Sequence, residues 1–287
     1  MNRTIVALVA LGLLATAGSV RAEQFENYNL YGTYIETFQS AAGAPAPVVG
    51  ICQLTFDGGG NLVLGTTLNP ASYCFTDSGA SIGCLQEFVA PSVYTVHPDG
   101  TGSISGTFTF IGGICGSTTF SETLLIQKLG KNQLAQNVLV ARTDSVVAPG
   151  DLVPQSAGPF SNTALYGNYA ETLGGSIGGN SFAGICNDFF NGAGGVSGSC
   201  TLNIATIPGP CQYALSGSYV VFANGLYGPG SGIIFPTSLT GTCGPVPFGE
   251  LLKIVNGTGS GANFLAGQVA AASYEANIEA GTYLLQW

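Results

Sequence analysis

The sequence predicts an all-β protein of two tandem antiparallel β domains, each a small barrel or sandwich stapled by disulfides. Three observations lead to this fold class: an internal repeat, eight cysteines divided equally between its two copies, and apolar residues that alternate with polar ones. Apolar residues at helical spacing are nearly absent after the N-terminal segment. At 287 residues the chain is long enough for two modest domains.

The repeat is visible by eye. LYGTYIET at residues 30–37 returns as LYGNYAET at 165–172, and GIC at 50–52 returns at 184–186. Each copy is too long for a solenoid unit of about 20–50 residues, so we expect each copy to be a domain. We place the first domain at 23–142 and the second at 162–287. Residues 143–161 are rich in proline and are expected to form a linker.

Residues 1–22 have the features of a secretory signal peptide: Arg3, an apolar run at 5–15, and the small-residue site Val20-Arg21-Ala22. The apolar run is too short to span a bilayer, which takes about 20 residues. We therefore expect a secreted protein, located outside the cell, at the cell surface or in the periplasm. In such oxidising compartments cysteines form disulfides.

The cysteines follow one another in the same order in both copies. A zinc site is disfavoured because the short C-x2-C spacing of zinc ligands is missing. Four cysteines allow three pairings in each copy. We favour Cys74–Cys84 and Cys200–Cys211, because these gaps change only from 10 to 11 residues between copies, and this leaves the outer cysteines of each copy to pair. The cysteines expected in disulfides are Cys52, Cys74, Cys84, Cys115, Cys186, Cys200, Cys211 and Cys243.

Strands are predicted where β-branched and aromatic residues alternate with hydroxyl residues. Residues 103–110 show this most clearly, and 94–96, 138–141 and 218–222 are shorter candidates. Hairpin turns are predicted at Asp57-Gly58 and Asp99-Gly100. These return in the second copy as Asn-Gly, which keeps the turn but loses the charge, so we do not expect calcium at either aspartate.

Charge is scarce, at 7% of residues against about 25% in an average domain. Removal of the signal takes away two of the six basic residues, which leaves four against 15 acidic ones and a net charge of −11. Nucleic acids and anionic lipids bind basic surfaces, so neither is an expected partner.

No catalytic set can be assembled from the sequence. His97 adjoins a turn and is replaced by Phe222 in the second copy. Residues 174–178 match the G-x-S-x-G pattern, but they lie in an expected hairpin without the helix that such a nucleophile needs. We therefore predict that the protein is not an enzyme and has no metal or cofactor.

Carboxylates retained in both copies are the candidate binding residues. Each shares a strand face with an aromatic residue two positions earlier. If that face points inward, the acid is a polar anchor in a ligand cavity. The alternative is a glutamate at the barrel rim. The candidate ligand-binding residues are Tyr34, Glu36, Glu122, Tyr169, Glu171 and Glu250.

The motifs G-x-Y at 32–34, F-D-G-x-G-N at 56–61 and Y-x-V-x-x-D-G-x-G at 94–102 resemble those of a loose group of secreted bacterial β proteins without assigned function. The chain is also similar to lipocalin-like barrels, in which a G-x-W on the first strand pairs with an arginine on the last. Here Tyr34 and Tyr169 replace the tryptophan, and Arg142 could supply the partner in the first copy only. The resemblance implies barrel architecture and is silent on activity.

Three functions remain. The first is a non-catalytic secreted or cell-surface structural protein that associates with itself or with other surface proteins. The second is a carrier of a small apolar ligand inside lipocalin-like barrels. The third is an outer-membrane β-barrel, which the alternating residues 281–287 with their terminal aromatic suggest.

Overall fold

The computed structural model describes residues 24–40, 48–66, 69–77, 83–110, 118–144, 147–223, 229–260, 263–273 and 278–286. The expected signal peptide, Cys115 and Trp287 lie outside the described residues.

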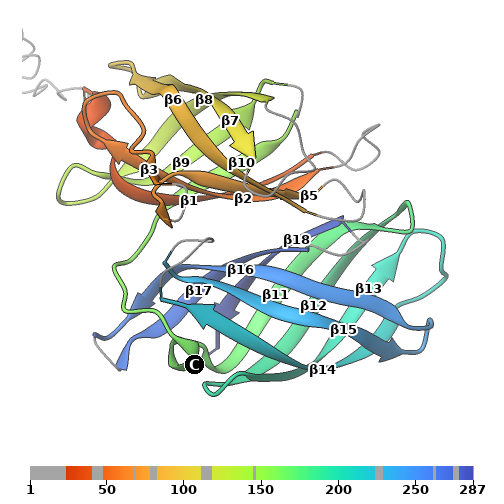
Figure 1. Ribbon diagram of the computed structural model, residues 1–287. Coiled ribbons are helices and arrows are strands. Elements are labelled where there is room, and N and C mark those ends of the chain that lie inside the picture. The colour runs from red at the N-terminus through yellow and green to blue at the C-terminus, as the bar shows by residue number, and fades with distance from the viewer. Residues whose placement is uncertain are drawn as a thin grey trace, which may run out of the picture.

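The all-β prediction is confirmed, because each copy of the repeat forms a closed eight-stranded antiparallel barrel (Figure 1). The strands follow one another around each barrel in chain order, and β1 and β11 close the barrels by pairing with β10 and β18. The predicted strands at 94–96, 103–110, 138–141 and 218–222 all lie within observed strands.

The 3₁₀ helix η1 Asn27–Asn29 precedes the first strand of the first barrel. β3 Gly65–Thr66 and β4 Asn69–Pro70 form a separate two-stranded ribbon that is not part of the barrel wall. The wall strands are β1 Tyr31–Gln39, β2 Val49–Asp57, β5 Tyr73–Asp77, β6 Cys84–Val96, β7 Thr101–Phe110, β8 Thr118–Leu129, β9 Ala135–Arg142 and β10 Pro149–Pro154.

The second barrel is entered through η2 Asn162–Ala164. Its strands are β11 Tyr166–Ile177, β12 Asn180–Asn191, β13 Gly195–Ile204, β14 Cys211–Phe222, β15 Ser231–Gly241, β16 Val246–Thr258, β17 Leu265–Ser273 and β18 Ile278–Leu285.

The segment expected to be a linker is partly a strand. Within 143–161, β10 pairs with both β1 and β9 and completes the first barrel. Its two prolines stand at the ends of the strand, where proline is tolerated. The same prolines are the reason that the sequence predicts a linker here.

The favoured cysteine pairing is wrong. The disulfides are Cys52–Cys74, Cys186–Cys200 and Cys211–Cys243, and Cys84 is bonded to a partner outside the described residues. Cys52 and Cys74 are register partners on β2 and β5, as Cys186 and Cys200 are on β12 and β13. The gap between them changes because the β3–β4 ribbon is inserted only in the first copy. No described cysteine is free.

Aromatic side chains fill the barrel interiors. In the first barrel the rings of Phe88, Phe108 and Phe120 lie with centroids 4.5–5.1 Å apart. At the end that each 3₁₀ helix covers, a tyrosine hydroxyl donates to the backbone: Tyr94 to Leu30 O at 2.9 Å, and Tyr219 to Leu165 O at 2.8 Å. An eight-stranded barrel is about wide enough for side chains alone, and these occupy that space.

The two barrels pack against each other along a buried apolar seam, with the first barrel (red to green) above the second (green to blue) in Figure 1. The seam residues are Ile35, Val49, Ile51, Tyr73, Phe75 and Leu85 from the first barrel, and Leu251, Val255, Ala270 and Ala272 from the second.

Lys253 is buried at the seam. Its Nζ donates to Tyr73 Oη of the first barrel at 2.6 Å, and to Ser231 Oγ at 3.1 Å and Pro229 O at 2.8 Å in the second. Burial lowers the pKa of Lys253 well below its usual range. The described helices are short 3₁₀ turns, none of which has the length or apolarity to cross a membrane.

Candidate functional site

The four retained glutamates lie inside the barrels, each buried, and they meet in pairs. Glu36 on β1 contacts Glu122 on β8, and Glu171 on β11 contacts Glu250 on β16. The interior position follows from strand periodicity, because each shares a face with a buried aromatic residue two positions earlier.

Tyr34 and Tyr169, the remaining candidate residues, do not join the carboxyl pairs. Their hydroxyls donate to backbone carbonyls two strands away around the barrel, Tyr34 to Ala135 O on β9 at 3.0 Å and Tyr169 to Ala266 O on β17 at 2.7 Å. Their rings pack edge to face on Phe56 and Phe190. Both tyrosines therefore stabilise their barrels through these hydrogen bonds and ring contacts.

In the first barrel, none of the four oxygens of Glu36 and Glu122 accepts a hydrogen bond from a described N–H or O–H donor. Burial raises the pKa of both groups, and the charge of Glu36 raises the pKa of Glu122 further. Both carboxyl groups are therefore held in surroundings that disfavour their charged forms.

A cation stands beside this pair. Arg142 on β9 is the register partner of Glu122 on β8. Its guanidinium lies over the rings of Phe38 and Phe120, 4.7 and 4.9 Å from their centroids, and its Nη2 lies 2.6 Å from Asp144 Oδ2. Arg142 lowers the pKa of both glutamates, against the stronger effect of burial.

The second barrel has a different set of neighbours. Tyr283 on β18 donates its hydroxyl to Glu250 Oε2 at 2.5 Å, and Asp188 on β12 lies near Glu171. Burial raises the pKa of Asp188 to about 8 and that of Glu250 to about 7. Burial, and then the charge of Glu250, raise the pKa of Glu171.

Two glycines make room for these carboxylates. A Cβ atom at position 198 would lie 1.9 Å from Asp188 Oδ1, and one at position 281 would lie 2.6 Å from Glu171 Oε1. Both distances are shorter than real Cβ atoms approach their neighbours. A side chain at position 198 or 281 would therefore require the neighbouring carboxylate to move.

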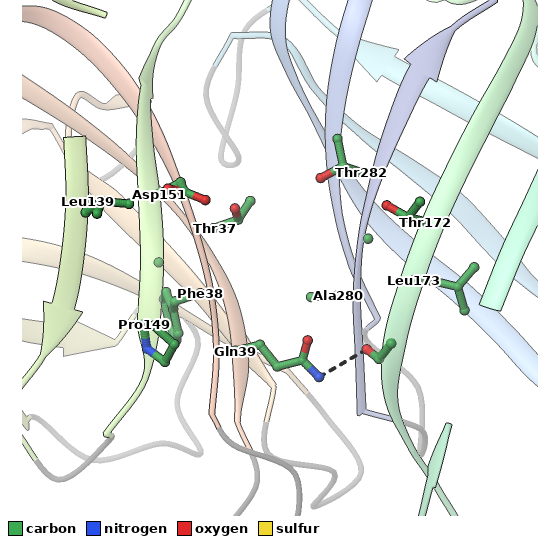
Figure 2. Close-up of a pocket in the computed structure, with 13 residues that line it drawn as sticks. Thr37, Phe38, Gln39, Leu139, Pro149, Asp151, Thr172, Leu173, Ala280 and Thr282 are labelled. Atoms are coloured by element: carbon green, nitrogen blue, oxygen red, sulfur yellow. Dashed lines mark hydrogen bonds between the residues drawn. The ribbon is translucent and has the colours of Figure 1, made fainter. Parts of the chain in front are cut away.

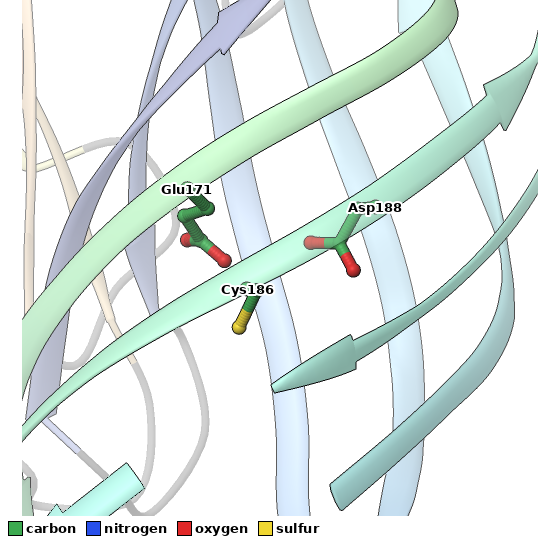
Figure 3. Close-up of side chains that lie close together, drawn as sticks. All are labelled: Glu171, Cys186 and Asp188. Atoms are coloured by element: carbon green, nitrogen blue, oxygen red, sulfur yellow. The ribbon is translucent and has the colours of Figure 1, made fainter. Parts of the chain in front are cut away.

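Figure 3 shows Glu171 and Asp188 on neighbouring strands with Cys186 between them, and their potential ligand atoms lie within 4.8 Å of one another. The sulfur of Cys186 is bonded to Cys200, so it is no thiolate ligand. The two carboxylates are the donors that remain.

Two neighbouring cavities lie between the barrels. One of about 480 Å³ is lined by Thr37, Gln39 and Asp151 on one side and by Thr172 and Thr282 on the other (Figure 2). Gln39 Nε2 donates across it to Gly174 O at 3.2 Å. Another of about 330 Å³ shares Thr37, Asp151 and Thr282 with it. Both lie between the barrels, whereas the carrier hypothesis expects an apolar ligand cavity within each barrel.

The residues for which the sequence predicts no catalytic or metal-binding role lie at or beside turns. His97 is exposed. Asp57 Oδ1 accepts from the backbone N–H of Gly59 at 2.7 Å, and Asn191 Oδ1 accepts from that of Ala193 at 2.8 Å. The Asp-to-Asn exchange thus keeps the turn contact, as expected. The G-x-S-x-G segment lies at the β11–β12 hairpin.

Sequence reasoning missed Asp188, Glu279, Tyr283 and Lys253. Asp188 follows Cys186 by two residues, and Tyr283 follows the buried Glu279 by four, so strand periodicity could have placed both side chains inside. They were overlooked because they are not retained in the first copy. Nothing in the sequence marks Lys253 as buried.

No protein-family model matches the chain, and no curated protein matches it in sequence. The chain's own repeat is therefore the comparison on which functional inference depends.

Proposed function

We propose that this is a non-catalytic structural protein, secreted or displayed at the cell surface, in which two barrels act as one rigid body. The observation that carries the proposal is the seam. Apolar side chains from both barrels are buried there, and Lys253 and Tyr73 hydrogen-bond across it. An interface of this kind resists movement between the domains, whereas polar interdomain contacts permit it.

The interior packing favours a structural role over a carrier of an apolar ligand. The space that a ligand would occupy in a lipocalin-like barrel is taken in the first barrel by Phe88, Phe108 and Phe120. A ligand would have to displace rings in mutual contact.

The orientation of side chains also disfavours the outer-membrane alternative. A barrel in lipid presents an apolar band outward and a polar interior. Here rings such as Phe88, Phe108 and Phe120 are buried in the interior, and hydroxyl residues such as Ser103 and Ser199 face outward. Disulfides support an oxidising compartment.

One surface suits contact with a second copy. On the outer face of the neighbouring strands β18, β11 and β12, four large apolar side chains are exposed. Ile185 is 63% exposed and Leu284 is 52% exposed. The rings of Tyr166 and Phe189 adjoin, with centroids 6.2 Å apart. We place self-association at this face.

The test is the native mass of protein taken from the producing cell, by sedimentation and native mass spectrometry. We expect complexes of several chains and no stoichiometric small molecule. Ile185→Ser combined with Phe189→Ser should dissociate them, because it removes apolar contact from the β18–β11–β12 face.

The matched control is Leu125→Ser with Leu139→Ser, which alters two exposed leucines on the outer face of the first barrel and should leave the complexes intact. A monomer that co-purifies with one apolar molecule per barrel would instead establish the carrier.

A further inference from the structure

The interior of the second barrel holds more carboxyl groups than its own basic residues could pair with. Glu171, Asp188 and Glu250 are fully buried. Neither oxygen of Glu171 or Asp188 accepts a hydrogen bond from a described donor. Buried polar groups without partners are rare in folded proteins and each calls for an explanation.

The first barrel provides the contrast. There, Arg142 is the register partner of Glu122, and at the equivalent place in the second barrel Ser273 is the register partner of Glu250. The second copy contains one Lys and no Arg. That residue, Lys253, is hydrogen-bonded at the seam, outside the barrel interior. The chain therefore has no side chain that could take the place of Arg142 in the second barrel.

The available donors define the kind of cation that would fit. Glu171, Asp188 and Glu250 offer carboxylate oxygens. Cys186 is locked in a disulfide, and the only histidine of the chain, His97, is in the first copy. Oxygen-only sites suit hard cations, and calcium accepts irregular sets of about six to eight oxygens from carboxylates, carbonyls and water.

We propose that the interior of the second barrel binds a calcium ion between the carboxylates of Glu171, Asp188 and Glu250. The ion would supply positive charge beside the buried carboxylates, as the guanidinium of Arg142 does in the first barrel. Glu171 and Asp188 face each other from adjacent strands (Figure 3). Glu250 contacts Glu171 from β16. Tyr283 holds Glu250 through its hydroxyl, and Gly198 and Gly281 leave the acids the space they occupy.

This site does not depend on the structural role proposed above, because a metal inside the barrel wall leaves the outer surfaces unchanged. It can be tested on the full secreted chain after treatment with a chelator. Isothermal titration with calcium chloride at neutral pH should show one ion per chain, with a Kd below about 1 mM, the range of extracellular calcium modules. The midpoint of thermal unfolding should rise with added calcium.

The decisive variant is Asp188→Leu, which gives the second barrel the residue that the first has at position 54. It removes a buried carboxyl group that has no described hydrogen-bond partner, so the chain should fold, and we expect calcium binding to weaken at least about 100-fold. The control is Asp57→Asn, which removes an exposed turn carboxylate that the second copy already lacks. It should bind calcium as the wild type does.

Absence of calcium binding by the wild-type chain would overturn the proposal, as would equal binding by Asp188→Leu. If Asp188→Leu fails to fold, Glu250→Gln supplies the same test. It keeps an oxygen for the Tyr283 hydroxyl but loses the charge, and unchanged calcium binding in that variant would also reject the site.

Discussion

Each of the two barrels has an eight-stranded wall, an equivalent disulfide and a buried pair of glutamates, but the residues around the glutamate pair differ. In the first barrel Leu152 is the register partner of Glu36, Leu54 is that of Tyr34, and Arg142 lies nearby. In the second barrel, Asp188 and Tyr283 occupy the positions of the two leucines. Duplication therefore kept the acids and exchanged the means of stabilising them, which shows that the pair and its surroundings are separable.

The largest expected effect comes from removing the internal cation of the first barrel. Arg142→Leu takes away the described positive charge that lies beside the buried Glu36, Glu122 and Asp144. Breaking a buried ion pair in this way costs about 3–5 kcal/mol of unfolding free energy. Urea denaturation would measure it.

Lys131→Met is the control for Arg142→Leu, since it removes a cation from an exposed turn and should change the unfolding free energy by less than about 0.5 kcal/mol. Equal effects of the two substitutions would mean that the carboxyl groups of the first barrel do not need Arg142.

A smaller effect should follow from filling the space beside Asp188. Gly198→Ala places a methyl group against the carboxylate, and overpacking of this kind costs about 1–3 kcal/mol. In an Asp188→Ala background the cost should fall but not vanish, because the carboxylate is gone whereas the Asn187 backbone oxygen would still lie 2.6 Å from the new Cβ atom. A double-mutant cycle on unfolding free energies gives the coupling. Additive effects would show that the wall, and not Asp188, requires the glycine.

The smallest effect concerns pH in the first barrel. Because the pKa of Glu122 is raised in the fold, the folded chain keeps a proton that the unfolded chain releases above its ordinary value of 4.5. The stability that this proton contributes is therefore fully present below that pH, and it is lost as the pH rises through the folded pKa.

Glu122→Gln should reduce this loss of stability with rising pH. Hydrogen exchange of β1 and β8 amides at about pH 5 and pH 8, compared between the variant and the wild type, would report it. A pH dependence that persists unchanged in the variant would assign the fall to other groups.

The fold was predictable because its signals are local and repeated. Alternating residues at 103–110 and the Asp57 and Asn191 turns can be assigned from a few neighbours each, and the structure bears them out. The β10 strand and the disulfides were mistaken because both depend on which strands become neighbours in the closed barrel. Spacing along the chain does not determine that.

The candidate site was predictable only in part. Retention in both copies identified the four glutamates, and strand periodicity placed them on the aromatic face. The same criterion excluded Asp188 and Tyr283, because they occur in one copy. Burial of Lys253 depends on the partner barrel, and no pattern within β16 reveals it. Functional residues that occur in only one of the two copies can be identified only when the two barrels are compared in three dimensions.

The two copies differ at the seam residues of the first barrel. Val49, Tyr73 and Phe75 of the first barrel are buried against the second, whereas their counterparts Ala183, Ser199 and Thr201 are exposed or half-buried hydroxyl and small residues. A chain that lost its second copy would expose a sheet of valine and aromatic side chains to water and be prone to aggregate. We therefore expect the first barrel to need the second one to stay soluble, which would be enough to maintain the tandem arrangement.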